Sequence, residues 1–210
     1  MKILIEVYLA TSNRNKVREI NEILENININ GSITVKYIFD EIKEDNFEVE
    51  EYGETYVENS VIKAWAYSKL IKKPVFSDDS GLSIISLGGF PGVNSARFME
   101  NYSYEQKMKK LLSMLENKKD RTAYFACAAT YFNPEKNILV SCQEEVYGKI
   151  AFEIRGKNGF GYDPIFIPEG YDNTFGELGK DVKNRISHRA KAIKSLLLML
   201  ESAKILEKYE

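Results

Sequence analysis

The chain has 210 residues, of which 44% are hydrophobic and 29% charged, and its formal net charge is −2. This length and balance fit a folded domain with a substantial core, and the charge argues against bulk binding to nucleic acid or to an anionic membrane. The chain has no apolar run long enough to cross a bilayer, and "MKILIEVYLA" lacks the cleavage site of a signal peptide. We therefore expect a cytoplasmic protein with neither a nucleic-acid nor a membrane partner.

The first segment predicts a strand, a helix and a second strand. Residues 2–10 are typical of a buried strand, apolar residues recur at helical spacing from Val17 to Ile27, and residues 32–39 predict another strand. The turn before the helix holds hydroxyl, amide and basic side chains: Thr11, Ser12, Asn13, Arg14, Asn15 and Lys16. Such groups at a helix N-terminus suit phosphate oxygens, although the glycines of a Walker A loop are missing. An ordinary strand-to-helix turn is an equally good interpretation of this pattern alone.

An acidic stretch follows between Asp40 and Glu58, where nine acids stand against one base, Lys43. Most of these acids are expected to form a solvated surface loop, and one or two of them are candidates for holding a cation. Thr55 and Glu58 have the spacing of a capping box, which predicts a helix running to about Leu70.

The next stretch, "PVFSDDSGLSI", places Asp78 and Asp79 where a predicted strand ends. Carboxylates at a strand end can hold Mg²⁺, and one of them could instead take a proton from an attacking water. A purely structural turn, with Asp capping backbone N–H groups and Gly81 at positive φ, explains the same residues equally well.

The centre of the chain predicts a capped helix and a hairpin. Ser103 and Gln106 form a second capping-box pattern for a helix to about Leu115. Two strands turning at residues 133–136 place Cys127 and Cys142 symmetrically about the turn, and we expect two reduced thiols rather than a disulfide.

Short strands are predicted at 149–153 and 165–167, and Ser187 can cap a last helix over about 188–208. Helices and strands that alternate at the start, followed by a central hairpin, favour a mixed α/β sheet with helices packed on its faces.

Two further motifs carry chemistry. In "NGFGYDPIF", glycines let the backbone approach a ligand, an aromatic ring can stack on a base, and Asp163 can accept hydrogen bonds from a base edge. An aromatic turn packed on the core is the alternative. In "KNRISHRAKA", Lys183, His188 and Arg189 gather near a helix start, where cations are unfavourable unless an anion or a purine edge binds.

Six motifs in order give the chain a wider resemblance. "TSNRNK", "ENSVIKA", "DDSGL", "GGFPGVNSARF", "GFGYDPIF" and "KNRISHR" resemble the pattern of the inosine triphosphate pyrophosphatase family, over roughly residues 3–194. The resemblance implies a hydrolase that converts non-standard purine nucleoside triphosphates (ITP, dITP, XTP) to the monophosphate and pyrophosphate.

The resemblance also implies the fold and the assembly. It predicts a single domain over residues 1–210, with an elongated mixed α/β sheet, flanking helices, and two lobes around a central nucleotide-binding cleft. A homodimer is expected, as is a requirement for Mg²⁺ or another divalent cation such as Mn²⁺.

Site residues carry over from the matching motifs. Asp79 is expected to be the base and a metal ligand, Glu48 the second metal carboxylate, and Lys63 a catalytic partner, although Phe47 replaces the proline that usually precedes the metal-binding acid. Residues 11–16 would cradle the triphosphate and Ser80 would contact the nucleotide. The purine and its 6-oxo edge would be bound by Phe160, Gly161, Tyr162, Asp163, Lys183, His188 and Arg189.

Two alternatives stay open. One is a catalytically silent protein that binds purine nucleotides, and the other is a related pyrophosphatase with a different base preference. The intact acids and Lys16 argue against the first, and "GFGYDPIF" with "SHR" favours purine over pyrimidine.

Overall fold

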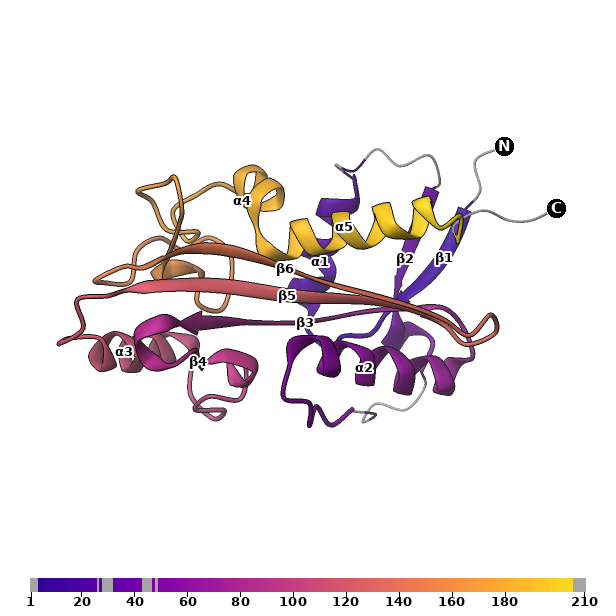
Figure 1. Ribbon diagram of the computed structural model, residues 1–210, viewed down its shortest axis with the longest axis horizontal. Helices are drawn as coiled ribbons and strands as arrows, with labels where there is room; N and C mark the ends of the chain where they lie inside the picture. The colour runs from indigo at the N-terminus through magenta and orange to yellow at the C-terminus, as the bar shows by residue number, and fades with distance from the viewer. Residues whose placement is uncertain (1–3, 26, 28–31, 43–46, 48, 206–210) are drawn as a thin grey trace. The chain divides into compact units, whose positions relative to one another are not determined.

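The computed structural model describes residues 4–25, 27, 32–42, 47 and 49–205. Figure 1 shows its elements, which in chain order are β1 (Leu4–Leu9), α1 (Arg14–Glu25), β2 (Ser32–Tyr37), α2 (Tyr56–Ile71), β3 (Val75–Ile84), β4 (Phe90–Pro91), α3 (Tyr104–Met114), β5 (Thr122–Asn133), β6 (Ile138–Ile150), β7 (Phe166–Pro168), α4 (Lys180–Ile186) and α5 (His188–Ser202).

The described strands form one mixed sheet. Its strand order is β2-β1-β3-β5-β6-β7, with β4 paired to β3. Strand β1 runs parallel to both β2 and β3, whereas β4 is antiparallel to β3 and β7 is antiparallel to β6. The prediction of a mixed α/β sheet with flanking helices is therefore confirmed.

The chain divides into two compact units, and unit 1 comprises residues 1–79, 127–144 and 189–210. Side chains alternate across its strands, as the pleat of a strand requires. Val7 and Leu9 of β1 pack in a core with α1 and α5, whereas Tyr8 and Ala10 pack in a second core with α2. Figure 1 accordingly shows α5 and α2 on opposite sides of the strands of this unit.

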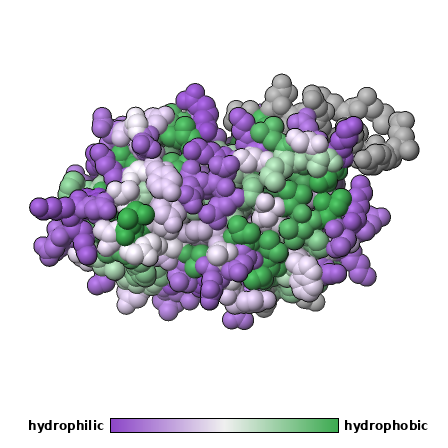
Figure 2. Space-filling view, viewed as in Figure 1, coloured by the Kyte–Doolittle hydropathy of each residue, from purple (hydrophilic) through white to green (hydrophobic). Residues whose placement is uncertain are grey.

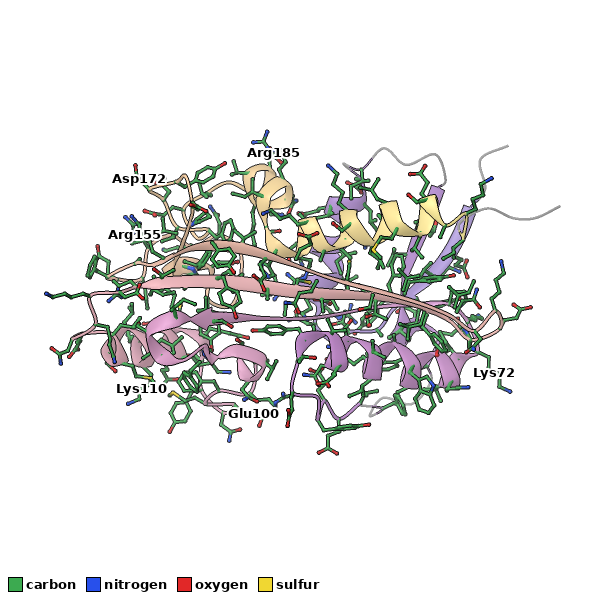
Figure 3. All side chains as sticks on the ribbon, in the orientation of Figure 1. Lys72, Glu100, Lys110, Arg155, Asp172 and Arg185 are labelled. Atoms are coloured by element: carbon green, nitrogen blue, oxygen red, sulfur yellow. The ribbon has the colours of Figure 1, made fainter. Side chains whose placement is uncertain are left out.

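Unit 2 comprises residues 80–126 and 145–188. Its core joins the second half of β3 to α3 and to aromatic side chains of β5 and β7. The rings of Phe125 and Phe166 lie edge to face with centroids 4.7 Å apart. At the surface, Arg155 Nη2 donates a hydrogen bond to the Asp172 carbonyl at 2.9 Å, and both residues are labelled in Figure 3.

Local signals predicted most elements correctly. Both capping boxes are present, Thr55 with Glu58 at α2 and Ser103 with Gln106 at α3. The hairpin of β5 and β6 turns between Asn133 and Ile138, as expected.

Four expectations were wrong. Asp78 and Asp79 lie in the middle of the ten-residue strand β3, not at its end, and Gly81 is not among the residues with positive φ. The strand expected at 149–153 is the end of β6, and α5 ends at Ser202 rather than near 208. The short helix α4 was not expected, because its seven residues are mostly polar.

Two structural points bear on the other expectations. No helix within the described ranges is long and apolar enough to span a membrane. That residues 1–210 act as a single domain stays a prediction.

Candidate active site

The turn between β1 and α1 is fastened by its own side chains. The Asn13 backbone N–H donates to Thr11 Oγ1 at 3.2 Å, and the Asn15 N–H donates to Asn13 Oδ1 at 3.0 Å. Thr11 is buried, while Ser12, Asn13, Arg14 and Asn15 are exposed at the first turn of α1. The predicted phosphate cradle is thus an exposed helix N-terminus with a fixed backbone, which suits an anion.

The two adjacent acids of β3 face different partners, because successive residues of a strand point to opposite faces. Asp78 Oδ2 lies 3.0 Å from Lys16 Nζ and accepts from Arg189 Nε at 3.2 Å. Asp79 Oδ2 accepts from Asn59 Nδ2 at 3.2 Å, and its Oδ1 lies 3.6 Å from Lys63 Nζ. The two acids therefore have different partners, and the role of Asp79 as base and metal ligand stays a prediction.

Asp78 is fully buried in a network of opposite charges. Burial alone raises the pKa of its carboxyl group, but the charges of Lys16 and Arg189 outweigh burial and hold that pKa below its usual range. Arg189 Nη1 also pairs with Glu19 on α1. These partners explain why a chain can bury an aspartate beside a second one. The same ion pairs hold the Arg189 guanidinium group within unit 1. The contact of Arg189 with the purine stays a prediction from the sequence.

Asp79 lies in a different electrostatic environment. Burial raises the pKa of its carboxyl group, and the charges of Lys63 and Lys16 only partly oppose this effect. Burial lowers the pKa of Lys63, but the charges of Asp79 and Glu51 reverse that effect and raise it. A carboxylate with a raised pKa beside a cation is suited to take a proton from a water molecule.

A metal ion would find two carboxylates on this side of β3. Lys63 Nζ lies 2.9 Å from Glu51 Oε1, so Lys63 contacts both Glu51 and Asp79. The part of the chain that the structure describes has no cluster of three or more His, Cys, Asp or Glu side chains arranged for a metal. Mg²⁺ commonly takes one or two carboxylates together with substrate phosphates and water, so this donor set fits it. Glu48 lies outside the described residues.

The predicted base-binding residues of unit 2 are joined by Asp163. Its Oδ2 accepts hydrogen bonds from the Phe160 backbone N–H and from Lys183 Nζ, both at 2.7 Å. Lys183 Nζ also lies 4.7 Å from the centroid of the half-buried Phe160 ring. Gly159 has φ +72°, and a Cβ at this position would lie 2.0 Å from Asp163 Oδ2. The loop therefore presents an aromatic face beside an ion pair that is already formed.

The remaining predicted residues of unit 2 pack more deeply. Tyr162 is buried, and its hydroxyl group donates to the Ser95 carbonyl at 2.9 Å. The His188 ring stacks on Phe125 with centroids 4.7 Å apart. Ser80, the first residue of unit 2, is half-buried. Contact of these residues with a nucleotide stays a prediction.

Sequence reasoning missed three residues of this site: Asn59, Glu51 and Glu19. One signal could have found Asn59, because it precedes Lys63 by four positions and so shares a helix face with it. Glu51 and Glu19 could not be distinguished from the other acids, since their partners are set by the tertiary fold.

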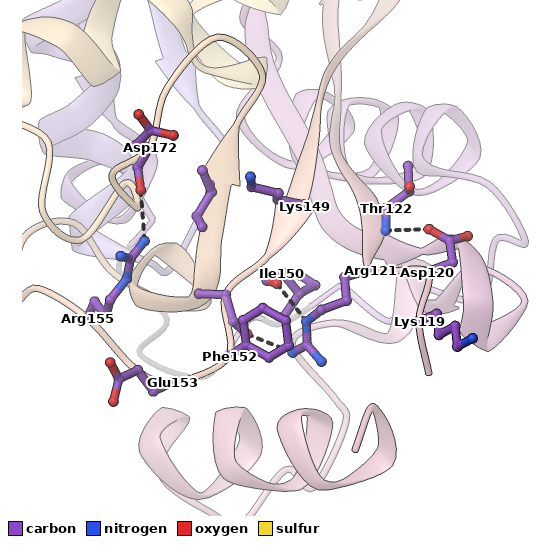
Figure 4. Close-up of a pocket in the computed structure, with 12 residues that line it drawn as sticks. Lys119, Asp120, Arg121, Thr122, Lys149, Ile150, Phe152, Glu153, Arg155 and Asp172 are labelled. Carbon is purple, nitrogen blue, oxygen red and sulfur yellow. Dashed lines mark hydrogen bonds between the residues drawn. The ribbon is translucent and has the colours of Figure 1, made fainter. Parts of the chain in front are cut away.

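A pocket elsewhere in unit 2 contains none of the predicted residues. It encloses about 670 Å³ and is shown in Figure 4. Arg121 lines this pocket and donates to the carbonyls of Ile150 and Ala151 at 2.8 and 2.7 Å. Phe152, another lining residue, is 86% exposed. We therefore do not assign the predicted site to this pocket.

Comparisons with known proteins agree over nearly the whole chain. A family model described as the Ham1 family matches residues 7–199. The dITP/XTP pyrophosphatase of Bacillus subtilis (strain 168) is 44% identical over 205 residues, covering 96% of this chain and 100% of the relative. The dITP/XTP pyrophosphatase of Aquifex aeolicus (strain VF5) is 38% identical over 213 residues, covering 96% and 98%.

Two solved structures have the same fold. The Staphylococcus aureus Ham1 protein superposes with a TM-score of 0.81 at 38% identity, covering 94% of this chain and 99% of that one. A HAM1 protein from Coxiella burnetii superposes with a TM-score of 0.82 at 36% identity, again covering 94% and 99%.

Proposed function

Because this chain belongs to the Ham1 family, we propose that it hydrolyses the non-standard purine nucleoside triphosphates dITP, ITP and XTP to the monophosphate and pyrophosphate. Such an enzyme would remove these nucleotides from the cellular pool. One observation carries the proposal: a buried Asp79 lies beside Lys63 in a chain that is 44% identical to a dITP/XTP pyrophosphatase over 96% of its length.

The chemistry follows from the charges on each side of β3. Asp79 takes a proton from water that attacks the α-phosphorus, and pyrophosphate leaves. Lys16 and the exposed N-terminus of α1 neutralise phosphate charge. Asp79 with Glu51, or with Glu48 as the sequence predicts, would hold the divalent cation. Mg²⁺, or another cation such as Mn²⁺, neutralises developing phosphate charge when bound.

Base selection is assigned to the loop of Asp163 and its partners. Phe160 offers a ring for stacking and Lys183 lies over that ring, so we propose Lys183 as a donor to a purine 6-oxygen. The contacts of His188 and Arg189 with the purine stay predictions from the sequence. Adenine presents an amino group at that position and leaves such donors unpaired, which costs about 1–3 kcal/mol for each buried group.

A substrate panel tests the proposed function. Pyrophosphate release is measured with Mg²⁺ for dITP, ITP, XTP, GTP, ATP and dUTP. We expect the first three to be strongly preferred. Orthophosphate as the direct product would contradict the proposal, tight binding of ITP without turnover would favour the silent nucleotide-binding protein, and preference for dUTP would favour the pyrimidine alternative.

A cytoplasmic homodimer is proposed as the working form. Figure 2 shows hydrophobic residues gathered over α2 and the neighbouring strands, and on α2 the side chains of Trp65 and Leu70 are 54% and 41% exposed. Light scattering on the purified protein should give about twice the chain mass of 24.1 kDa. A mass equal to that of one chain across the working concentration range would contradict the dimer.

A further inference from the structure

The side chain of Asn59 joins the predicted base to the acidic loop before α2. Its Nδ2 donates to Asp79 Oδ2 at 3.2 Å, its Oδ1 accepts from the Gly53 backbone N–H at 2.8 Å, and the residue is 0% exposed. We propose that Asn59 is a positioning residue, which holds the Asp79 carboxylate and the loop of residues 49–54 in one arrangement. The inference rests on the proposed function, in which Asp79 is the base and a metal ligand.

The two hydrogen bonds fix which way the amide points. A backbone N–H can only donate, so Gly53 must face the amide oxygen of Asn59, and the amide nitrogen must then face Asp79. That nitrogen can also only donate, so Asp79 Oδ2 is held as an acceptor. The other carboxylate oxygen, Oδ1, is left on the side of Lys63. Asn59 thus determines that Oδ1, and not Oδ2, is the oxygen of Asp79 that faces the Lys63 ammonium group.

The helix that carries Asn59 is itself fastened to β3. The next residue is Ser60, whose Oγ donates to Thr130 Oγ1 at 2.8 Å. The Ser60 carbonyl accepts a hydrogen bond from Ser77 Oγ at 2.6 Å. These three hydroxyl residues are at most 1% exposed. A side chain supported by such a buried network is held more precisely than one on a free loop.

Gly53 shows how closely the loop approaches the amide. A Cβ at Gly53 would lie 2.7 Å from Asn59 Oδ1 and 2.7 Å from the Cβ of Glu58. Two positions before Gly53, Glu51 reaches Lys63, which lies one turn after Asn59 on α2. Asn59 and Lys63 therefore set the positions of Glu51 and Asp79, the two acids proposed to hold the cation.

Two substitutions and a matched control test this role. Asn59→Ala removes both hydrogen bonds. Asn59→Asp keeps the shape and the acceptor for Gly53, but it replaces the donor to Asp79 with a second carboxylate oxygen, which repels Asp79. Thr55→Ala removes the N-cap of the same helix without touching Asp79. For each variant we would measure kcat and KM for dITP, the melting temperature, and Mn²⁺ affinity without substrate by paramagnetic resonance of the free ion.

We expect kcat to fall roughly 10- to 100-fold in both Asn59 variants, the range for losing a hydrogen bond to a buried charged group, with KM changed much less. Mn²⁺ affinity should fall about tenfold in Asn59→Ala, a modest loss by the same reasoning. Thr55→Ala should lower the melting temperature and leave kcat and Mn²⁺ affinity unchanged.

A folded Asn59→Asp protein with wild-type kcat would overturn the proposal, as would equal losses of kcat in Thr55→Ala, because Asn59 would then act only through helix stability. If no triphosphate on the panel is hydrolysed by the wild type, the proposed function fails instead. Weaker Mn²⁺ binding by Asn59→Ala would still support the positioning role in that case.

Discussion

Asp78 is expected to matter more for stability than for proton transfer. Its side chain is fully buried between Lys16 and Arg189, so Asp78→Asn leaves two cations with less compensating charge. Breaking a buried pair by removing one partner typically costs about 3–5 kcal/mol. We therefore expect the free energy of unfolding, measured with urea, to fall by that amount. The matched control is Glu41→Gln, which removes the exposed pair of Glu41 with Lys73 and should leave the midpoint almost unchanged. Equal losses in both variants would contradict this assignment.

Asp79 should show the opposite behaviour. Burial already disfavours its charged form, and Lys63 keeps its contact with Glu51, so Asp79→Asn removes a poorly solvated charge without leaving Lys63 unpaired. The melting temperature should therefore change little. Turnover of dITP should nevertheless fall by about 10²–10⁴-fold, the usual range for a general base. The measurement is kcat under saturating substrate and Mg²⁺. Activity above roughly a tenth of wild type would remove Asp79 from this role, since a loss that small lies below that range.

The two cysteines give a pH-dependent prediction. Both are free; burial raises the pKa of the Cys142 thiol to about 11, with a further contribution from the charge of Glu144, and the pKa of the buried Cys127 is also raised. Because the thiolate is the reactive form, alkylation of Cys142 by iodoacetamide should rise about tenfold per pH unit between pH 8 and pH 10. A rate that levels off near pH 8.5, as for an ordinary thiol, would contradict this. In Cys142→Ser, Cys127 should react only on unfolding.

At the scale of elements, the loop around Gly159 is expected to fix the position of the Asp163 carboxylate. Gly159→Ala would need positive φ and would place a Cβ 2.0 Å from Asp163 Oδ2, displacing the acceptor that Phe160 and Lys183 share. We expect KM for dITP to rise roughly tenfold, which corresponds to about 1.4 kcal/mol of lost binding free energy. Gly170 is the matched control, because it also has positive φ (+82°) but nothing lies within 4 Å of its added Cβ. Similar KM values for the two variants would contradict a role for the loop in binding the base.

The same scale shows what the sequence could predict. Capping boxes are local, so the starts of α2 and α3 could be predicted from residues three apart. The predicted end of strand β3 lies several residues before its observed end, because two acids shortly before a glycine are also a turn signal. One of the two cations that pair with the buried Asp78, Arg189, is 111 positions away from it, and no local pattern reveals this pair.

The candidate site divides in the same way. Motifs indicated Asp79 and Lys63, which the structure brings together, and Asp163 with Lys183, which form an ion pair. The amide of Asn59 could not be assigned, because its role depends on the loop backbone at Gly53 approaching it in the folded chain.

At the scale of the whole molecule, neither unit is a continuous segment. The chain passes between units after residues 79, 126, 144 and 188, and the strands β3, β5 and β6 each contribute residues to both. A unit of this kind cannot be cut from the chain as one piece. Shared strands also mean that unfolding one unit removes residues from strands of the other, which favours a single cooperative transition.

Two probes can test this cooperativity. Trp65 is the only tryptophan of the chain and belongs to unit 1, so its fluorescence reports that unit, whereas far-UV circular dichroism reports both. We expect coincident urea midpoints by the two probes in the wild type. Asp78→Asn in unit 1 and Gly159→Ala in unit 2 should each lower both midpoints together. If Asp78→Asn lowered only the fluorescence midpoint, the units would unfold independently, because the circular dichroism of unit 2 would then persist at urea concentrations where Trp65 already reports an unfolded environment.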